Sequence, residues 1–452
     1  MSQEPERRES ERRESERRAP RRIGVGLVGC GVVGTGILQL LHDNRETIEG
    51  RLGAPIDVHR IAVGDVSKTR DAIVPNDKVC GDPFEVVDDP RVEIVVEVMG
   101  GTTLADEVLT AALERGKHVV TANKALVAEK GDVLLQTAEA KQVDLYFEAA
   151  VAGGIPIIRV LREGLASDRI VALRGIVNGT SNYILSRMSA EGIDFTEALK
   201  GAQEAGYAEA DPTLDVGGGD ACHKLAILTT LAYGAKIHPD QITTSGIDTL
   251  TAQDIHYAAR FGYVIKPLAL AIPTKDGALD VRVHPALVPQ GSVLANIHGA
   301  LNAVYVEGAM VGPCLLSGPG AGALPTAMSV VSDIVDVGRN MLARAHGRVP
   351  SRAFRGASLR EWPICPAKER RSRFYLRLSV LDRVGALARI AGVLSGFGVS
   401  IEQMIQDAKG GAATLIILTH EANEGDLREA LSELSRLRHV DGTPQALVIE
   451  EP

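Results

Sequence analysis

The chain has 452 residues, of which 45% are hydrophobic and 24% charged, values that are ordinary for a globular protein of two or three domains. Its formal net charge is −9, and the first 22 residues hold eight arginines against six glutamates, so the remainder is more acidic still, which argues against a nucleic-acid surface. Five cysteines without paired spacing favour a reducing compartment over a disulfide framework or a zinc site, and we expect a cytoplasmic protein.

Residues 1–20 repeat the pentapeptide ERRES and contain few apolar side chains, so we expect a disordered charged tail. Residues 23–41 carry no charge, and a signal or membrane segment is one interpretation of them. Six glycines within this run are unsuited to a bilayer helix and fit a nucleotide-binding loop better. We therefore expect no membrane association.

The nucleotide loop follows the first predicted strand. Residues 22–28 form a short apolar strand, and an apolar helix is predicted over residues 36–42. Between them lies a GxGxxG motif made of Gly29, Cys30, Gly31, Val32, Val33 and Gly34. Gly29 makes the tight turn, Gly31 lets a pyrophosphate approach the backbone, and Gly34 lets the helix pack on the strand. Because N–H groups at a helix start bind phosphates, we expect a site for NAD or NADP.

Candidate cofactor-selecting side chains follow the second predicted strand, residues 56–63. Asp65 could accept the ribose 2′-hydroxyl of NAD, whereas Lys68 and Arg70 could pair with the extra phosphate of NADP. The pattern leaves the choice of cofactor open.

The next two predicted strands end in turns of the kind that bind ligands. Residues 92–98 have the continuous apolar pattern of a buried parallel strand, and the turn after them contains Gly100 and Thr102. Helices over residues 104–115 and 126–140 flank a further strand over residues 118–121. Lys124 follows the carboxyl end of that strand, where it is either a catalytic group or an ordinary surface lysine.

After a strand over residues 144–147, residues 148–156 are predicted to cross from the first domain to the second. Their small side chains would allow carbonyl groups to turn inward around a cation, although a plain linker fits the spacing equally well.

The second domain is predicted to begin with a strand over residues 170–178, a turn at 179–182 that caps a helix, and a helix over 195–205. The following stretch, residues 206–224, holds too many charges for a core segment: Glu209, Asp211, Asp215, Asp220 and Lys224. A helix from Asp220 onward places Asp220 and Lys224 on one face, after three glycines that free the backbone. This pattern fits either a grip on a small charged substrate or a solvated, salt-bridged helix start.

Strands at Ile247 and over residues 264–272, 279–283 and 303–310 predict a sheet that is open on one face. A glycine-rich loop at residues 317–323 leads into a helix over 326–342, which we expect to return to cover the cofactor. The C-terminal part alternates strand, helix, strand, strand, helix and strand over residues 374–380, 386–397, 400–406, 412–419, 424–436 and 445–449. This βαββαβ order predicts a ferredoxin-like module without a catalytic cluster.

The expected fold class is α/β. It comprises a Rossmann-type dinucleotide-binding domain, an α+β catalytic and dimerisation domain with an open sheet, and the C-terminal ferredoxin-like module. The predicted boundaries are a tail at residues 1–20, the nucleotide domain at 21–150, the substrate domain at 151–325, the returning helix at 326–346, a linker at 347–372 and the module at 373–452.

Four segments resemble homoserine dehydrogenases: the glycine loop, Thr-Ala-Asn-Lys at 121–124, residues 175–183, and residues 202–224, which match the family signature at every spaced position. The C-terminal module resembles an ACT domain through residues 382–385 and 400–401. The resemblance implies interconversion of L-aspartate 4-semialdehyde and L-homoserine with NAD(P)H, on the branch toward threonine, isoleucine and methionine.

The resemblance also implies roles for single residues. Reduction of an aldehyde needs a proton for the developing alkoxide, and Lys224 is the first choice of donor and Lys124 the second. Asp220 would orient Lys224. Substrate binding is assigned to four residues, of which the first two would hold the substrate ammonium group: Glu209, Asp215, Asn178 and Thr180.

Further ligands follow from the same resemblance. The cofactor site would extend to Gly100, Thr102, Lys124 and Gly322. Backbone carbonyls would bind a monovalent cation such as sodium at Glu148, Val151, Gly153 and Ile155. Threonine would bind near Asp382 and Gly385, at a subunit interface of a homodimer or homotetramer.

One departure from the family bears on cofactor choice. Many NADP-binding relatives have arginine where this chain has Gly64, which favours NAD. Two alternative functions are another two-domain NAD(P)-dependent amino-acid or sugar dehydrogenase that uses Asn123 and Lys124, and a non-enzymatic amino-acid sensor. A metal site at Cys222 and His223 is disfavoured because adjacent helix residues point apart.

Overall fold

The computed structural model describes residues 21–409 and 412–451, so the predicted tail lies outside the described residues. The chain divides into two compact units. Unit 1 is the part up to Ala150 together with Gly322–Ser351, and unit 2 is Val151–Ala321 together with the part from Arg352 onward. No helix in the described part of the chain is both long and apolar enough to cross a bilayer.

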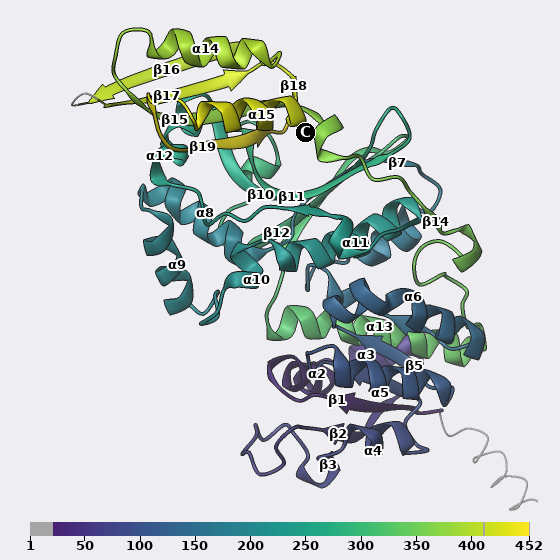
Figure 1. The fold of residues 1–452 in the computed structure, drawn as a ribbon. Coiled ribbons are helices and arrows are strands. Elements are labelled where there is room, and N and C mark those ends of the chain that lie inside the picture. The colour runs from purple at the N-terminus through teal and green to yellow at the C-terminus, as the bar shows by residue number, and fades with distance from the viewer. Residues whose placement is uncertain (1–20, 410–411, 452) are drawn as a thin grey trace, which may run out of the picture. The chain divides into compact units, whose positions relative to one another are not determined.

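Unit 1 is built on a parallel sheet with helices (Figure 1). Its strands are β1 (Ile23–Val28), β2 (Ile56–Ala62), β3 (Val79–Cys80), β4 (Ile94–Glu97), β5 (His118–Thr121) and β6 (Leu145–Tyr146). Its α-helices are α2 (Val32–Asp43), α3 (Arg45–Leu52), α4 (Pro83–Asp88), α5 (Thr103–Glu114), α6 (Lys124–Lys141) and α13 (Ala323–Ala343). Short 3₁₀ turns are η1 (Asn76–Lys78) and η2 (Glu148–Ala150).

The strand order β3-β2-β1-β4-β5-β6 reverses between β1 and β4, which is the position where open parallel sheets bind ligands. Every residue of β1, β4 and β5 is buried, as expected for strands covered by helices on both faces. The predicted Rossmann-type domain is therefore confirmed.

Helix α2 begins at Val32, four residues before the predicted start. The sequence pattern missed this because the glycines within the helix were taken to belong to the loop. Gly36 lies against α13, since a Cβ at this position would be 2.9 Å from the carbonyl oxygen of Ala323. The glycines thus allow α2 and α13 to pack closely in the core of unit 1.

Unit 2 is organised around a mixed sheet that has 11 strands among the described residues, nine of them in the order β13-β12-β7-β10-β11-β19-β15-β17-β16. These are β7 (Ile170–Ile176), β10 (Tyr263–Pro273), β11 (Leu279–Pro289), β12 (Leu301–Gly308), β13 (Gly312–Pro319), β15 (Arg371–Leu381), β16 (Ile401–Lys409), β17 (Ala412–Thr419) and β19 (Val440–Ile449). Short strands are β9 (Thr243–Thr244) on β11, β18 (Ala422–Asn423) on β15, and the separate pair β8 (Ala235–Lys236) and β14 (Arg360–Glu361).

The helices of unit 2 are α7 (Ile157–Arg159), α8 (Gly179–Glu191), α9 (Phe195–Glu204), α10 (Thr213–Val216), α11 (Gly219–Tyr233), α12 (Ala252–Arg260), α14 (Ala386–Gly396) and α15 (Glu424–Leu434). Shorter helical turns are η3 (Val160–Gly164), η4 (Pro239–Gln241), η5 (Leu294–Asn296), η6 (Gly356–Ser358) and η7 (Ala367–Glu369).

Three sequence-based expectations in unit 2 are wrong in detail. Ile247 lies in a bend, and the strand in this region is β9. Strand β11 continues six residues beyond the predicted end, to Pro289. Strand β13 was missed because its glycines and prolines suggest a loop, and such residues are tolerated there because β13 is an edge strand of this sheet.

The C-terminal module has the predicted βαββαβ order, and its strands lie in the ferredoxin-like sequence β19-β15-β17-β16. It is also continuous with the rest of unit 2, because β19 pairs in parallel with β11 at Ala286↔Val448 and Leu287↔Ile449 (Figure 1). Apolar side chains from both parts share one core, including Ile184 and Ile255 from helices α8 and α12 and Leu418 from β17.

The segment before the module also packs on unit 2. Leu359 and Cys365 are buried, β14 pairs with β8, and Leu279 pairs with Ile364. The only tryptophan, Trp362, lies with its ring centroid 6.3 Å from that of Tyr233. The module is thus joined to the rest of unit 2 by a sheet, a core and a packed connection.

This shared core predicts that a cavity in the module also destabilises the rest of unit 2. Leu418→Ala removes a side chain that is 1% exposed, and such changes cost about 2–5 kcal/mol. We expect the urea midpoint of unfolding, followed by Trp362 fluorescence, to fall although Trp362 lies outside the module. The fully exposed Val384 provides a control, since Val384→Ala should leave the midpoint unchanged. An unmoved Trp362 transition in the Leu418 variant would contradict the shared core.

Candidate active site

The glycine loop of unit 1 has the geometry of a phosphate-binding turn. Gly29 has φ of 103°, and a Cβ there would lie 2.7 Å from the carbonyl oxygen of Val98. A Cβ on Gly34 would lie 2.4 Å from the carbonyl oxygen of Gly29, so this glycine is needed for packing. Gly31 differs, because a Cβ there would meet no protein atom within 4 Å. The absence of a side chain at Gly31 leaves room for a ligand.

The start of helix α2 fits an anionic group. Gly31 is its N-cap residue, and no side chain caps the first N–H groups of the helix. Beside it lies a cavity of about 520 Å³ lined by Val28, Gly29, Cys30, Gly31, Ala62, Val63, Gly64, Asp65, Lys68, Arg70, Gly81, Pro83, Val98, Met99 and Leu104. Uncapped N–H groups and the positive end of the helix dipole suit a dinucleotide pyrophosphate, so these residues fit the predicted cofactor.

The three predicted cofactor-selecting residues line this cavity together. Asp65 accepts hydrogen bonds from the backbone N–H of Ser67 at 2.9 Å and from its hydroxyl at 2.6 Å, which lower the pKa of Asp65. Arg70 donates from Nη1 to the carbonyl oxygen of Lys68 at 2.7 Å and from Nη2 to that of Asp65. The loop thus holds a carboxylate and two cations at one wall of the cavity.

A buried carboxylate that the sequence interpretation missed connects β4 and β5. Glu97 accepts hydrogen bonds from the N–H of Met99 at 2.9 Å and from Oγ1 of Thr121 at 2.6 Å. Burial raises the pKa of Glu97. A charged residue within the apolar run at 94–98 was the available signal. Glu97 fixes the turn that holds Gly100, which has φ of 79°.

Lys124 is the first residue of helix α6, and it is half-buried. Asn123 precedes it as the N-cap, accepting from the N–H of Leu126 at 3.1 Å and donating to the carbonyl oxygen of Gly101 at 2.6 Å. Thr102 is the N-cap residue of α5 in the neighbouring turn, and Gly322, with φ of 124°, is the N-cap residue of α13.

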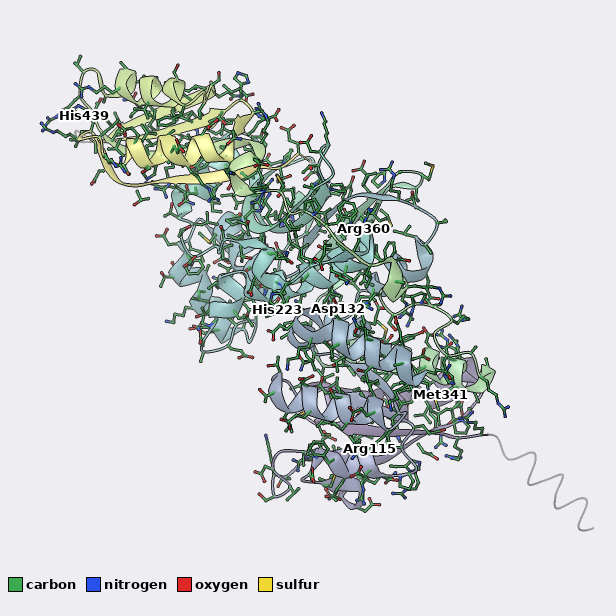
Figure 2. All side chains as sticks on the ribbon, turned by 45° about the vertical axis from the view of Figure 1, so that its right-hand side comes forward. Arg115, Asp132, His223, Met341, Arg360 and His439 are labelled. Atoms are coloured by element: carbon green, nitrogen blue, oxygen red, sulfur yellow. The ribbon has the colours of Figure 1, made fainter. Side chains whose placement is uncertain are left out.

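In unit 2, helix α11 carries the predicted catalytic pair in a buried position. The helix can be located in Figure 2 by His223, the residue directly before Lys224. Lys224 is 9% exposed and Asp220 is 4% exposed. The Lys224 ammonium donates to Oδ2 of Asp220 at 2.7 Å and to the carbonyl oxygen of Val177 at 2.7 Å. The solvated helix start is excluded, because these charges lie inside unit 2.

Asn178 joins the two carboxylates of this site. Its Nδ2 donates to Asp215 at 2.7 Å and to Asp220 at 2.9 Å, while its Oδ1 accepts from the N–H of Ser181 at 2.8 Å and caps helix α8. The Ser181 hydroxyl donates to the carbonyl oxygen of Asp215 at 3.0 Å. The structure thus brings Asn178, Asp215, Asp220 and Lys224 into one hydrogen-bonded cluster.

The two remaining predicted substrate residues, Thr180 and Glu209, lie outside this hydrogen-bonded cluster. The Thr180 hydroxyl donates to the carbonyl oxygen of Tyr207 at 2.6 Å, and the Tyr207 ring lies 4.6 Å from that of Tyr183. Glu209, two residues beyond Tyr207, is exposed, and among the described residues its carboxylate makes no hydrogen bond or ion pair. Both tyrosines lie in segments that resemble the family, but the sequence analysis assigned neither of them a role.

The predicted cation ligands occupy a sharply curved segment. Glu148 lies in the 3₁₀ turn η2, and its N–H donates to Asp333 at 2.7 Å. Val151 and Ile155 are buried, and Gly153 has φ of 34°. The predicted effector residues lie at the turn between β15 and α14, where Asp382 is exposed and Gly385 has φ of 87° as the N-cap residue of α14.

One further polar cluster does not support a metal site. Ligand atoms of His118, Asp144 and His346 all lie within 4.8 Å of one another in unit 1. However, Nδ1 of His118 accepts the N–H of Asp144 at 3.0 Å. Burial lowers the pKa of His118 to about 4, so the neutral ring carries its proton at Nε2 and offers no free lone pair.

Comparisons with known proteins agree over most of the chain. The family model described as homoserine dehydrogenase matches residues 156–335, that of the homoserine dehydrogenase NAD-binding domain matches residues 29–148, and that of the ACT domain matches residues 374–439. A homoserine dehydrogenase of Pseudomonas aeruginosa is 43% identical over 422 residues, which cover 91% of this chain and 95% of the relative.

Solved structures give the same result. The chain is similar to a homoserine dehydrogenase from Thiobacillus denitrificans, with a TM-score of 0.91 and 45% identity over 95% of this chain and 99% of that one. It is also similar to a hyperthermophilic archaeal homoserine dehydrogenase in complex with NADPH, with a TM-score of 0.59 and 27% identity over 70% of this chain and 98% of that one.

Two glycines of the loop provide a matched test of the cofactor site. Gly31→Ala adds a methyl group where no protein atom lies, so we expect an unchanged melting temperature and at least roughly tenfold weaker dinucleotide binding by calorimetry. Gly34→Ala forces a methyl group against a carbonyl oxygen, so we expect a lower melting temperature. Unimpaired dinucleotide binding by the Gly31 variant would contradict the assigned loop.

Proposed function

The chain belongs to the homoserine dehydrogenase family, and from this we propose that it interconverts L-aspartate 4-semialdehyde and L-homoserine. The observation that carries the proposal is the hydrogen-bonded cluster of Lys224, Asp220, Asn178 and Asp215, which combines a cation for a carbonyl oxygen with carboxylates for an ammonium group. The reaction serves the biosynthesis of threonine, isoleucine and methionine.

In the proposed mechanism, Lys224 donates the proton when the aldehyde is reduced. An ammonium has three N–H donors, and contacts with Asp220 and Val177 account for two of them. The third would bind the substrate carbonyl oxygen and stabilise the negative charge that develops there. Asp220 fixes the Lys224 rotamer, so little reorganisation is needed as the charge forms.

Lys124 remains the second candidate for proton donor. The Asn123 cap holds the start of helix α6, and Glu97 holds the preceding strand ends through Thr121. This support gives Lys124 a fixed backbone beside the dinucleotide-binding edge of unit 1.

Asp215 would bind the substrate ammonium group. Its carboxylate is half-buried and oriented by Asn178, so an ammonium gains a charge-assisted hydrogen bond there. Glu209 would add a second carboxylate from the exposed loop that holds Tyr207. Thr180 supports this loop through the Tyr207 carbonyl oxygen and so contributes to the same site.

The cofactor is a nicotinamide dinucleotide, which supplies or accepts the hydride when bound. We propose that both NAD and NADP bind, because Asp65 faces the cavity beside Lys68 and Arg70. Asp65 suits a ribose hydroxyl, and the two cations suit a phosphate. The exposed Gly64 adds no side chain to either interaction.

We also propose that carbonyl groups of Glu148, Val151, Gly153 and Ile155 bind a monovalent cation such as sodium. The left-handed backbone at Gly153 supports the curvature that such a site requires, and oxygen ligands suit a hard cation. Equal activity in sodium and in an organic cation would contradict this site.

Regulation and assembly are further parts of the proposal. Threonine would bind the ACT domain near Asp382 and Gly385. Inhibition by threonine would then be lost in an Asp382→Ala variant.

The edge strand β13 exposes Leu315, which supports pairing of subunits into a homodimer or homotetramer. A monomer by light scattering would contradict this assembly.

Five free cysteines support a cytoplasmic location. Detection of the protein in a secreted fraction alone would contradict that location.

Removal of the Lys224 ammonium tests the proposed proton donor. We expect Lys224→Ala to lower kcat for homoserine oxidation at least about 100-fold, the range of general acid catalysis, while dinucleotide binding by unit 1 persists. Lys124→Ala would show the larger loss instead if Lys124 is the donor. Lys200→Ala, which changes an exposed lysine, is the matched control and should retain activity.

Substitution of Arg70 tests the proposed phosphate contact. We expect Arg70→Ala to raise KM for NADPH about tenfold and to leave KM for NADH within twofold, since NADH lacks the phosphate. Arg45→Ala, which removes an exposed arginine paired with Glu49, should change neither value. An equal rise in both KM values would contradict a role of Arg70 in selecting the phosphate.

A further inference from the structure

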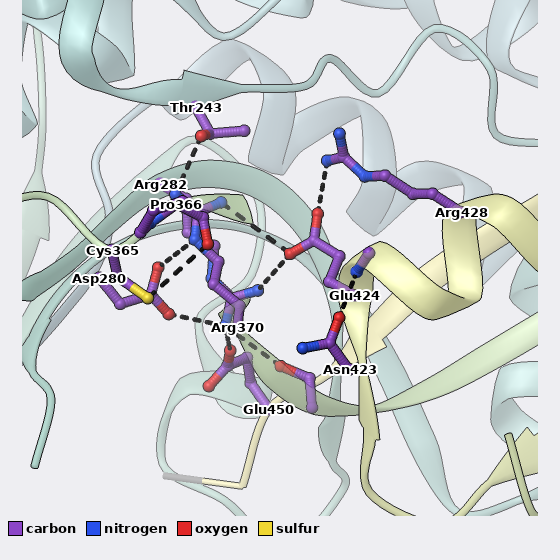
Figure 3. Close-up of polar contacts among 12 residues, drawn as sticks. Thr243, Asp280, Arg282, Cys365, Pro366, Arg370, Asn423, Glu424, Arg428 and Glu450 are labelled. Atoms are coloured by element: carbon purple, nitrogen blue, oxygen red, sulfur yellow. Dashed lines mark hydrogen bonds and ion pairs between the residues drawn. The ribbon is translucent and has the colours of Figure 1, made fainter. Parts of the chain in front are cut away.

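A buried cluster of charged residues lies where the ACT domain meets the rest of unit 2 (Figure 3). Arg282, Arg370 and Glu450 are 6%, 4% and 8% exposed. Nη2 of Arg282 lies 2.9 Å from Oε1 of Glu450 and 3.1 Å from Oδ2 of Asp280. Nε of Arg370 lies 2.9 Å from Oδ1 of Asp280, and its Nη1 lies 3.9 Å from Oε2 of Glu424.

The members of this cluster come from both sides of the junction. Asp280 and Arg282 lie on β11, whereas Glu424 begins helix α15 of the ACT domain and Glu450 directly follows β19. Arg370 immediately precedes β15. The two arginines thus hold strand β11, helix α15 of the ACT domain and Glu450 after β19 in one arrangement.

Stability alone is a poor explanation for this cluster. Burial raises the pKa of both Asp280 and Glu450, so the loss of hydration opposes their charge. Buried ion pairs often contribute less to stability than apolar side chains of the same volume, but they demand one specific geometry. A fixed geometry at a domain junction is useful for transmitting a change of position.

The cluster is linked directly to strand β9. Nη2 of Arg370 donates to Oγ1 of Thr243 at 3.0 Å. Strand β9 pairs with β11 through Thr243↔Arg282 and Thr244↔Val283, and the N–H of Ser245 donates to the carbonyl oxygen of Val283 at 2.8 Å. Arg370 is therefore attached to β9 through its side chain, and Arg282 is attached to β9 through the pairing of β9 with β11.

Strand β9 in turn packs against the start of the catalytic helix. Gly218 is the N-cap residue of α11, with φ of 87°. A Cβ at Gly218 would lie 2.9 Å from Cγ2 of Thr244 and 3.2 Å from Cγ1 of Val283, so there is no free space between β9 and the helix start. Asp220 follows two residues later, and Lys224 lies one helical turn beyond it.

We infer that Arg370 and Arg282 are positioning residues that act through β9 and Gly218 on Asp220 and Lys224, and that they couple these groups to the ACT domain. A shift of α15 or of Glu450 would move the arginines, and close packing would transmit this movement through β9 to the start of α11. This inference rests on the proposed function of Lys224 and adds the route by which the ACT domain reaches it.

Two conservative substitutions on opposite sides of Arg370 test the inference in the full-length enzyme. Thr243→Val removes the hydroxyl that accepts from Arg370 and keeps the shape of the side chain. Glu424→Gln removes the charge that Arg370 meets in the ACT domain. Glu421→Gln is the matched control, because Glu421 pairs with Arg371 on the surface, where both side chains are 60% exposed.

We expect each of the two variants to lower kcat/KM for homoserine roughly threefold or more, the range of measured couplings, with KM for the dinucleotide unchanged. The double variant should show no greater loss than the single ones, because both interrupt one route. The inference would be overturned by wild-type kinetics in both variants or by additive losses in the double variant. An equal effect on the KM values for homoserine and for the dinucleotide would also overturn it.

A second readout does not depend on turnover. Hydrogen exchange of the amides at residues 216–224 should be faster in Thr243→Val at an unchanged melting temperature, and unchanged exchange there would overturn the inference. If the wild-type enzyme did not oxidise homoserine, the proposed function would fail while this experiment still tested the route. The Glu421→Gln control should match the wild type in exchange and in kinetics.

Discussion

The site depends on the need to hold a buried ammonium group. Lys224 is 9% exposed, and an unpaired charge at that depth would be expensive, so the structure must supply partners for it. Asp220 does so from the same helix, and the Val177 carbonyl does so from the end of β7. Asn178 then joins Asp220 to Asp215, so satisfying one charge fixes the whole cluster.

The same constraint explains the surrounding fold. Helix α11 must begin where Asp220 meets Asn178. Gly218 makes this possible because it adopts the left-handed backbone required there and has no side chain to separate β9 from the helix start. Strand β9 is held by β11, and β11 is held by the ACT domain through β19 and the buried arginines. The ACT domain is therefore part of the framework that positions helix α11.

The sequence predicts those features that local spacing determines. The glycine spacing at 29–34 predicted the nucleotide loop, and the separation of four between Asp220 and Lys224 predicted a shared helix face. Contacts between distant segments were not predictable in this way. The Val177 carbonyl has no side-chain signature, and the pairing of β19 with β11 joins residues more than 150 positions apart. Strand β13 was hidden by its glycines and prolines.

We propose that the cluster of Lys224, Asp220, Asn178 and Asp215 serves the oxidation of L-homoserine and the reduction of L-aspartate 4-semialdehyde. The most direct test is the initial rate of dinucleotide reduction by the full-length protein with L-homoserine, compared with L-2-aminobutyrate, which lacks the hydroxyl group. The account predicts saturable formation of reduced nicotinamide with L-homoserine and none with L-2-aminobutyrate. No reduction of either NAD or NADP by L-homoserine would contradict it.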